Sequence, residues 1–221
     1  MFEPLAQQSD AALFSRVQAG DTDAFSELVR RYQTALVRVA RSRLGRMDWA
    51  EDVVQETFLS AFKSCASYDA RYGFRTWLWT ILLNQCANHY QRRMRSVPLD
   101  PWPSEPDEAA SAAGDERGET SPLGNLLAKE RAAELESLLL ELSVVQADAL
   151  RLRFFGGLKF QEIADAMQCS LNTAKNRVRW GLMRMAELMQ TAESMQSDGA
   201  DGARCRRSER GGESQRECEA P

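Results

Sequence analysis

The chain has 221 residues, a formal net charge of −4, five cysteines and a single histidine. This length is sufficient for one or two domains, and the scattered cysteines, which we expect to be reduced, lack the spacing of metal ligands. The longest apolar stretch, around Trp77 to Leu83, is too short to cross a bilayer. We therefore expect a cytoplasmic protein that has no membrane insertion and binds neither a metal nor a cofactor.

Four helices are predicted before residue 96. Ser9 or Asp10 can cap the first, and Asp21 and Asp23 can start a second, which Gly45 ends. The second helix carries apolar side chains at three- and four-residue steps, namely Phe25, Leu28, Val29, Tyr32, Leu36, Val39, Ala40 and Leu44. Because this period is that of a helix and no sustained apolar-polar alternation occurs, we predict an all-α fold.

A third helix should begin at Asp48, as its cap, and reach about Ser64. Its apolar side consists of Val53, Val54, Thr57, Phe58, Ala61 and Phe62, and its opposite side of Asp52, Gln55, Glu56, Leu59 and Lys63. Polar anchors around a leucine suit a helical protein partner, although such a pattern alone is more often a solvated face.

The fourth predicted helix, from about Phe74 to Met94, begins with aromatic residues and ends with arginines. Residues 71–95 contain five arginines and no acidic residue. This combination suits single-stranded DNA, because bases stack on rings while guanidinium groups hold the backbone. We assign Trp77 and Leu78 to the core, and the candidate DNA contacts are Phe74, Arg75, Asn84, Asn88, Arg92 and Arg93.

Residues 96–124 combine prolines with acidic and small side chains, which is typical of a flexible acidic linker. A helical pattern resumes near Leu126, and the last thirty or so residues contain almost no large apolar side chain. We therefore predict two small helical domains, 1–95 and 125–190, joined by the linker and followed by a disordered tail, 191–221.

The segment from Leu158 to Met185 predicts a helix-turn-helix, with Ser170 as the cap of its second helix. We expect Leu171, Ala174, Val178, Leu182 and Met185 to point inward. The outer face holds Thr173, Lys175, Asn176, Arg177, Arg179 and Trp180. Such side chains can reach bases and phosphates, with base contact concentrated at Lys175, Asn176 and Arg179, although a charged stripe alone can be a solvated face. Neither Trp180 nor Gly181 has an assigned role.

Three motifs occur in order along the chain: AEDVVQETF at 50–58, FRTWL at 74–78, and EIA at 162–164 followed by TAKNR at 173–177. With these motifs the sequence closely resembles the extracytoplasmic-function sigma factors of the sigma-70 family. The resemblance covers about residues 20–95 and 128–189. It implies a non-enzymatic protein that directs RNA polymerase to promoters.

The resemblance also implies a role for each domain. In the first, Asp52, Gln55 and Glu56, with Leu59 beside them, would bind the clamp helices of the polymerase's largest subunit. Asn84 and Asn88 would lie in the helix that reads the −10 element, near a loop around residues 68–74 that captures an extruded base. The second domain would read the −35 element and touch the polymerase flap. Members of the family often have an anti-sigma factor, so such a partner is a further expectation.

Two other function classes are considered. A conventional DNA-binding regulator would need an effector site in residues 1–95 and would bind a duplex without polymerase. An enzyme is not supported, because the sequence has no glycine-rich phosphate loop, no Ser-His-Asp set and only one histidine.

Overall fold

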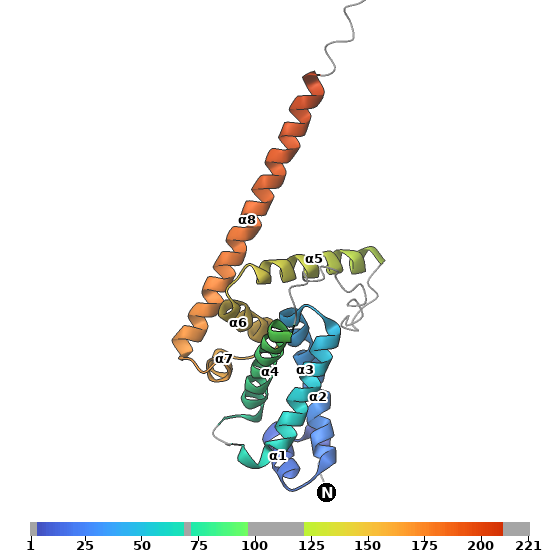
Figure 1. Ribbon diagram of the computed structural model, residues 1–221, viewed down its shortest axis with the longest axis vertical. Coiled ribbons are helices and arrows are strands. Elements are labelled where there is room, and N and C mark those ends of the chain that lie inside the picture. The colour runs from blue at the N-terminus through green and yellow to red at the C-terminus, as the bar shows by residue number, and fades with distance from the viewer. Residues whose placement is uncertain (1–3, 69–71, 97–121, 210–221) are drawn as a thin grey trace, which may run out of the picture.

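The computed structural model describes residues 4–68, 72–96 and 122–209, and these residues form helices and contain no strand (Figure 1). The elements, in chain order, are η1 (Leu5–Gln7), α1 (Asp10–Gln18), α2 (Thr22–Leu44), α3 (Met47–Lys63), η2 (Cys65–Ser67), α4 (Phe74–Ser96), α5 (Pro122–Leu140), α6 (Val144–Phe154), α7 (Phe160–Ala166) and α8 (Leu171–Glu209). The all-α prediction is confirmed. Of the predicted linker, residues 97–121 lie outside the described residues, and α5 already begins at Pro122.

Local sequence signals define the ends of the first two helices as predicted. The Ser9 side chain accepts a hydrogen bond from the backbone N–H of Ala12, and Asp21 caps α2 by accepting from the N–H groups of Asp23 and Ala24. Gly45 ends α2 with a φ of 76°, in the left-handed region where a glycine has no steric penalty.

The predicted cap of α3 is wrong. The helix begins at Met47, and its N-cap residue is Arg46, whose side chain makes no capping bond. Asp48 lies inside the first turn, where its carboxylate accepts hydrogen bonds from the Arg46 guanidinium and from the N–H of Trp49. Its negative charge still stabilises the helix, because the carboxylate lies at the N-terminal, positive end of the helix dipole.

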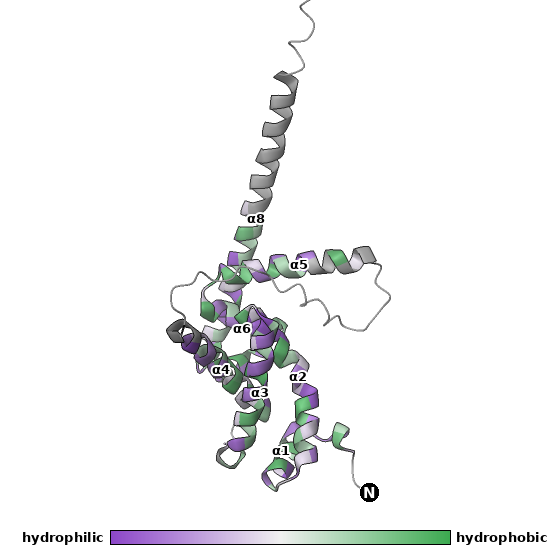
Figure 2. Ribbon diagram, turned by 45° about the vertical axis from the view of Figure 1, so that its right-hand side comes forward, coloured by the Kyte–Doolittle hydropathy of each residue, from purple (hydrophilic) through white to green (hydrophobic). Residues whose placement is uncertain are grey.

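The first unit is a bundle of α1 to α4 around an apolar core, visible as the green inner faces in Figure 2. Its largest fully buried side chains are Leu13, Phe14, Leu28, Leu36, Leu78, Trp79 and Leu82. Phe14 lies at the centre of an aromatic group, with its ring centroid 4.8 Å from those of Tyr68 and Phe74 and 5.5 Å from that of Trp77. The assignment of Leu78 to the core is confirmed, and Trp77 packs against it.

The second unit is formed mainly by α6, α7 and α8, with α7 and the start of α8 making the predicted helix-turn-helix. The buried stripe of α8 consists of Ala174, Val178, Gly181 and Met185. Leu171 and Leu182 are 39% and 44% exposed, so their predicted inward orientation is wrong. Leu171 is the first residue of the helix, and Leu182 lies one position beyond the stripe.

Gly181 allows α8 to approach α6 closely. A Cβ atom at this position would lie 2.9 Å from Cδ1 of the buried Leu150. The close contact explains why a residue that weakens helices stands within α8.

Helix α8 continues to Glu209, so residues 191–209 are helical where the sequence indicated a disordered tail (Figure 1). An existing helix extends without a new nucleation cost, which favours such a continuation. Within the described ranges, none of these helices is both long and apolar enough to pass through a bilayer.

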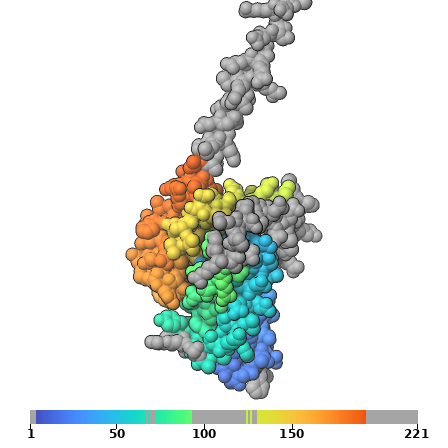
Figure 3. All heavy atoms as spheres, viewed as in Figure 1, coloured from blue at the N-terminus to red at the C-terminus, as the bar shows by residue number. Residues whose placement is uncertain are grey.

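The two units pack against each other, α4 on α7 and α2 on α6, and their buried apolar side chains form a single hydrophobic core. In the space-filling view the two units lie in direct contact (Figure 3). This contact between segments far apart in the chain determines which candidate site residues remain accessible.

Candidate functional site

The outer face of α3 exposes the side chains predicted to meet a protein partner. Asp52, Gln55 and Glu56 are exposed, and Leu59 is 46% exposed. The helix is anchored from behind by Val53, Val54, Thr57, Phe58 and Ala61, all buried. Phe62, predicted to lie on the apolar side, is 42% exposed and therefore extends the surface around Leu59. The face thus combines three polar side chains with a small apolar centre.

Helix α4 presents a polar stripe along its second half. Asn84, Asn88 and Arg92 follow at four-residue steps and are all exposed. The amide of Gln85 donates to the hydroxyl of Ser60 at 3.0 Å, which fixes this part of α4 against α3. Arg93 is in the helix, but its side chain lies outside the described residues. The stripe can offer amide and guanidinium donors to bases and phosphates.

Two other predicted contacts on α4 are engaged inside the protein. Phe74 is 3% exposed, with its ring centroid 4.8 Å from that of Phe14 and 5.8 Å from that of Tyr32. It is a core residue, and the predicted base contact does not fit this position. Arg75 is half-buried and donates through Nη2 to the carbonyl oxygens of Gly156 and Gly157 at 2.7 and 2.9 Å.

An exposed aromatic ring lies two residues before Phe74 in the chain. Tyr72 is 52% exposed, while its carbonyl accepts a hydrogen bond from the hydroxyl of Tyr68. Residues 69–71 of this loop lie outside the described residues. Tyr72 lies in the loop that was expected to capture a base but was not itself a predicted contact, and the sequence signal for it was an aromatic residue directly before Gly73.

Helix α8, the second helix of the helix-turn-helix, begins with a well-defined cap. Ser170 Oγ accepts from the backbone N–H of Thr173 at 3.1 Å and lies 2.8 Å from that residue's hydroxyl. Beyond this turn Lys175 and Arg179 are exposed, while Thr173, Asn176 and Arg177 are half-buried. Lys175 and Arg179 are therefore exposed cations on a helix whose first turn is capped by Ser170.

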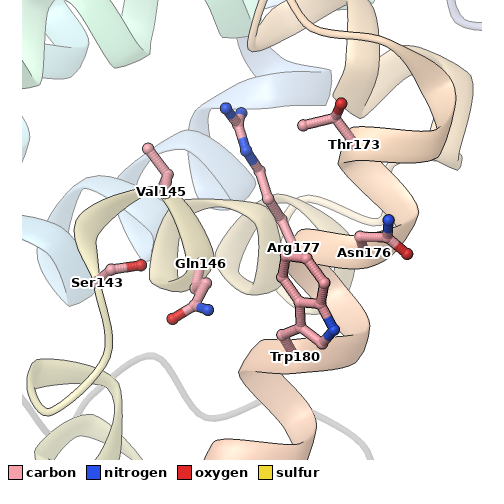
Figure 4. Close-up of a pocket in the computed structure, with 7 residues that line it drawn as sticks. All are labelled: Ser143, Val145, Gln146, Thr173, Asn176, Arg177 and Trp180. Atoms are coloured by element: carbon pink, nitrogen blue, oxygen red, sulfur yellow. The ribbon is translucent and has the colours of Figure 1, made fainter.

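A shallow cavity of about 260 Å³ lies between the start of α6 and α8 (Figure 4). Its lining combines hydroxyl, amide and guanidinium groups with an indole, and consists of Ser143, Val145, Gln146, Thr173, Asn176, Arg177 and Trp180. Trp180, to which the sequence assigned no role, is 56% exposed.

The cysteines with described side chains, Cys65, Cys86 and Cys169, are free thiols. Cys86 is buried, and burial raises the pKa of its thiol to about 11. A thiol with such a pKa is almost wholly protonated at neutral pH and therefore a weak nucleophile.

Two family models match the chain. Residues 28–96 match sigma-70 region 2, and residues 132–185 match sigma-70 region 4. The RNA polymerase sigma-H factor of Pseudomonas aeruginosa is 32% identical over 174 residues, which are 79% of this chain and 90% of the relative. The ECF RNA polymerase sigma-E factor of Escherichia coli K12 is 33% identical over 181 residues, covering 78% and 90% of the two chains.

Solved structures of similar fold include CnrH in complex with the cytosolic domain of CnrY. The comparison of this chain with CnrH has a TM-score of 0.63 and 23% sequence identity, and it covers 83% of this chain and 99% of the CnrH chain. The sigma factor RpoE in complex with the anti-sigma factor NepR, from Bartonella quintana, has a TM-score of 0.55 at 24% identity and covers 75% and 96%. At these identities the likeness establishes the fold.

Proposed function

Because this chain belongs to the extracytoplasmic-function sigma factors of the sigma-70 family, we propose that it joins core RNA polymerase through α3 and selects promoters through α4 and α8. It is a transcription initiation factor, and this role requires no chemical step of its own. We also propose that the protein is cytoplasmic, because its proposed partner, RNA polymerase, acts in that compartment.

The observation that carries the proposal is the exposed face of α3. Asp52, Gln55 and Glu56 surround the exposed Leu59, and none of the described residues of the second unit covers them. A helical partner with basic side chains around an apolar groove would complement this face, and the clamp helices of the largest polymerase subunit are the proposed partner. The flap of the second subunit is the proposed partner of residues 125–190.

Reading of the −10 element is assigned to α4 and the adjacent loop. Asn84, Asn88 and Arg92 form the exposed stripe, and we assign Arg93 to it from the sequence alone. Stacking of one base on an aromatic ring contributes about 1–3 kcal/mol, comparable with the cost of unstacking it. The exposed Tyr72 is a suitable ring, because Phe74 is occupied in the core.

Reading of the −35 element is assigned to α8. Lys175 and Arg179 are exposed, and Thr173, Asn176 and Arg177 keep part of their surface accessible. Arginine and lysine can pair with guanine edges, and asparagine with adenine, in the major groove. An anti-sigma partner is also proposed, because the similar sigma factor RpoE is described in complex with the anti-sigma factor NepR.

The proposal is tested with the variant Asp52→Ala, Gln55→Ala of the full chain. We expect capture of core polymerase in a pull-down to be lost, because both polar anchors of the α3 face are removed. Asp23→Ala, an exposed acidic residue on α2 that lies outside the proposed polymerase and DNA contacts, serves as the control and should bind normally. Unchanged melting curves would show that both variants fold, and full polymerase binding by the double variant would contradict the assignment.

A further inference from the structure

The loop between η2 and α4 carries the exposed ring of Tyr72, and a hydrogen bond joins the loop's two described ends. Tyr68 is the C-cap residue of η2, and Tyr72 lies two residues before the start of α4. The hydroxyl of Tyr68 donates to the carbonyl oxygen of Tyr72. Because this bond spans residues 69–71, it fixes the backbone of Tyr72 relative to η2.

The ring of Tyr68 is itself held by the core. Its centroid lies 4.8 Å from that of Phe14 and 5.1 Å from that of Trp77, with an edge-to-face geometry in both pairs. Such aromatic pairs are stabilising beyond the area that they bury. The backbone just before the ring is held as well, because the side-chain amide of Gln18 donates to the carbonyl of Cys65 at 2.9 Å. The Tyr68 hydroxyl is therefore supported by α1, η2 and α4 together.

Packing alone does not account for a tyrosine at position 68, because a phenylalanine ring would make the same aromatic contacts. What the hydroxyl adds is a hydrogen-bond donor, and the carbonyl of Tyr72 accepts it. A second tyrosine of the same aromatic group, Tyr32, packs against Phe74 and donates its hydroxyl to the carboxylate of Asp10. Of these two tyrosines, Tyr68 is the one whose hydroxyl reaches the loop.

The anchored backbone leaves the side chain of Tyr72 as the part of this residue that a ligand can reach. Its ring is 52% exposed, whereas that of Phe74, two residues later, is 3% exposed. A base that stacks on Tyr72 immobilises the ring and the backbone that carries it, and this ordering costs conformational entropy. A backbone that is already held has less freedom to lose, so the hydrogen bond from Tyr68 favours capture of the base.

We propose that Tyr68 is a positioning residue, whose hydroxyl holds Tyr72 in place to stack on an unpaired base. This inference rests on the proposed function, which assigns stacking to the Tyr72 ring and gives the Tyr68 hydroxyl no role. Tyr68 requires no contact with DNA, because it acts through the carbonyl of Tyr72. The variant Tyr68→Phe isolates this role, since it removes the hydroxyl and keeps the ring.

The first experiment measures backbone hydrogen exchange of the free, full-length protein by mass spectrometry. Tyr68→Phe should speed exchange about threefold or more in a peptide that contains Tyr72 and Gly73, because the bond that holds this backbone is lost. Tyr32→Phe is the matched control, since it removes a hydroxyl from the same aromatic group and should leave that peptide unchanged. Unchanged exchange in Tyr68→Phe would overturn the proposal, and so would equal acceleration by Tyr32→Phe, which would indicate general loosening of the group.

The second experiment measures base capture by the holoenzyme on a promoter mapped from this chain's own transcripts. The −10 element of the probe is single-stranded, and an abasic sugar replaces each of its bases in turn. The captured position is the one where the wild type prefers the intact base and Tyr72→Ala does not. Tyr68→Phe should reduce this preference about three- to tenfold, the value of one hydrogen bond, with core polymerase binding unchanged.

The preference for the intact base separates positioning from a general structural defect, which would weaken binding of the intact and abasic probes alike. A wild-type preference in Tyr68→Phe, together with its loss in Tyr72→Ala, would overturn the inference and leave the proposed function standing. If Tyr72→Ala kept the preference at every position, the proposed base capture would be wrong and the positioning role with it, while hydrogen exchange would still report the bond between the two tyrosines.

Discussion

Replacing Phe74 by alanine should destabilise the first unit, and this distinguishes a packing role from a base-stacking role. The ring is 3% exposed and lies in an aromatic group with Phe14, Tyr32 and Trp77. Loss of a buried phenyl ring removes its transfer free energy and leaves a cavity, which together cost about 3–5 kcal/mol. This loss is a large fraction of the stability of a small domain.

The assay is urea unfolding of the full chain, followed by circular dichroism. Tyr72→Ala is the matched control, because this ring lies two residues away but is 52% exposed. We expect Tyr72→Ala to change the unfolding free energy by less than about 1 kcal/mol while weakening binding of a single-stranded −10 oligonucleotide. If Phe74→Ala retained its stability and lost oligonucleotide binding, the ring would be a stacking group and the packing argument would be refuted.

Three further predictions concern side chains of α8 and the Glu27 carboxylate of α2. Lys175→Ala and Arg179→Ala should each weaken discrimination of the −35 element by about 1–3 kcal/mol in promoter binding by the holoenzyme, and unchanged discrimination would exclude the residue as a base contact. Gly181→Ala should lower the unfolding free energy in urea, because overpacking against Leu150 costs about 1–3 kcal/mol against a helix gain of about 1 kcal/mol. Stabilisation would show that Leu150 moves aside easily. Hydrogen bonds from Arg30 and then Arg31 lower the pKa of Glu27 from 4.5 to about 2, so its stabilising effect is present above pH 4.5 and is lost as the pH falls toward 2. Glu27→Gln should flatten the stability-against-pH curve in that window, and an unchanged slope would contradict the pairing.

Features governed by near neighbours in the chain were predictable from the sequence. Ser9, Asp21 and Ser170 cap their helices because hydroxyl and carboxylate oxygens accept N–H groups two or three residues ahead. Gly45 ends α2 for an equally local reason. Asp48 shows the limit of such arguments, because a carboxylate within the first turn can interact with the helix dipole without being the cap.

Contacts between distant segments were not predictable in the same way. Arg75 is a residue type that commonly contacts DNA, yet its guanidinium group donates to backbone carbonyls more than 80 residues away in the chain. Asp148 and Arg151 would pass for a solvated pair at i, i+3, and only the packing of α6 on α2 buries them. A single sequence identifies residue types and helical faces, but it does not show which face another unit covers.

The central claim is that this chain confers promoter selection on core RNA polymerase. The most direct test is transcription in vitro with core polymerase and a library of genomic fragments, with the transcript 5′ ends read by sequencing. We predict defined start sites preceded by shared −10 and −35 sequences, present only when the chain is added. Transcripts that are the same with and without the chain would contradict the claim.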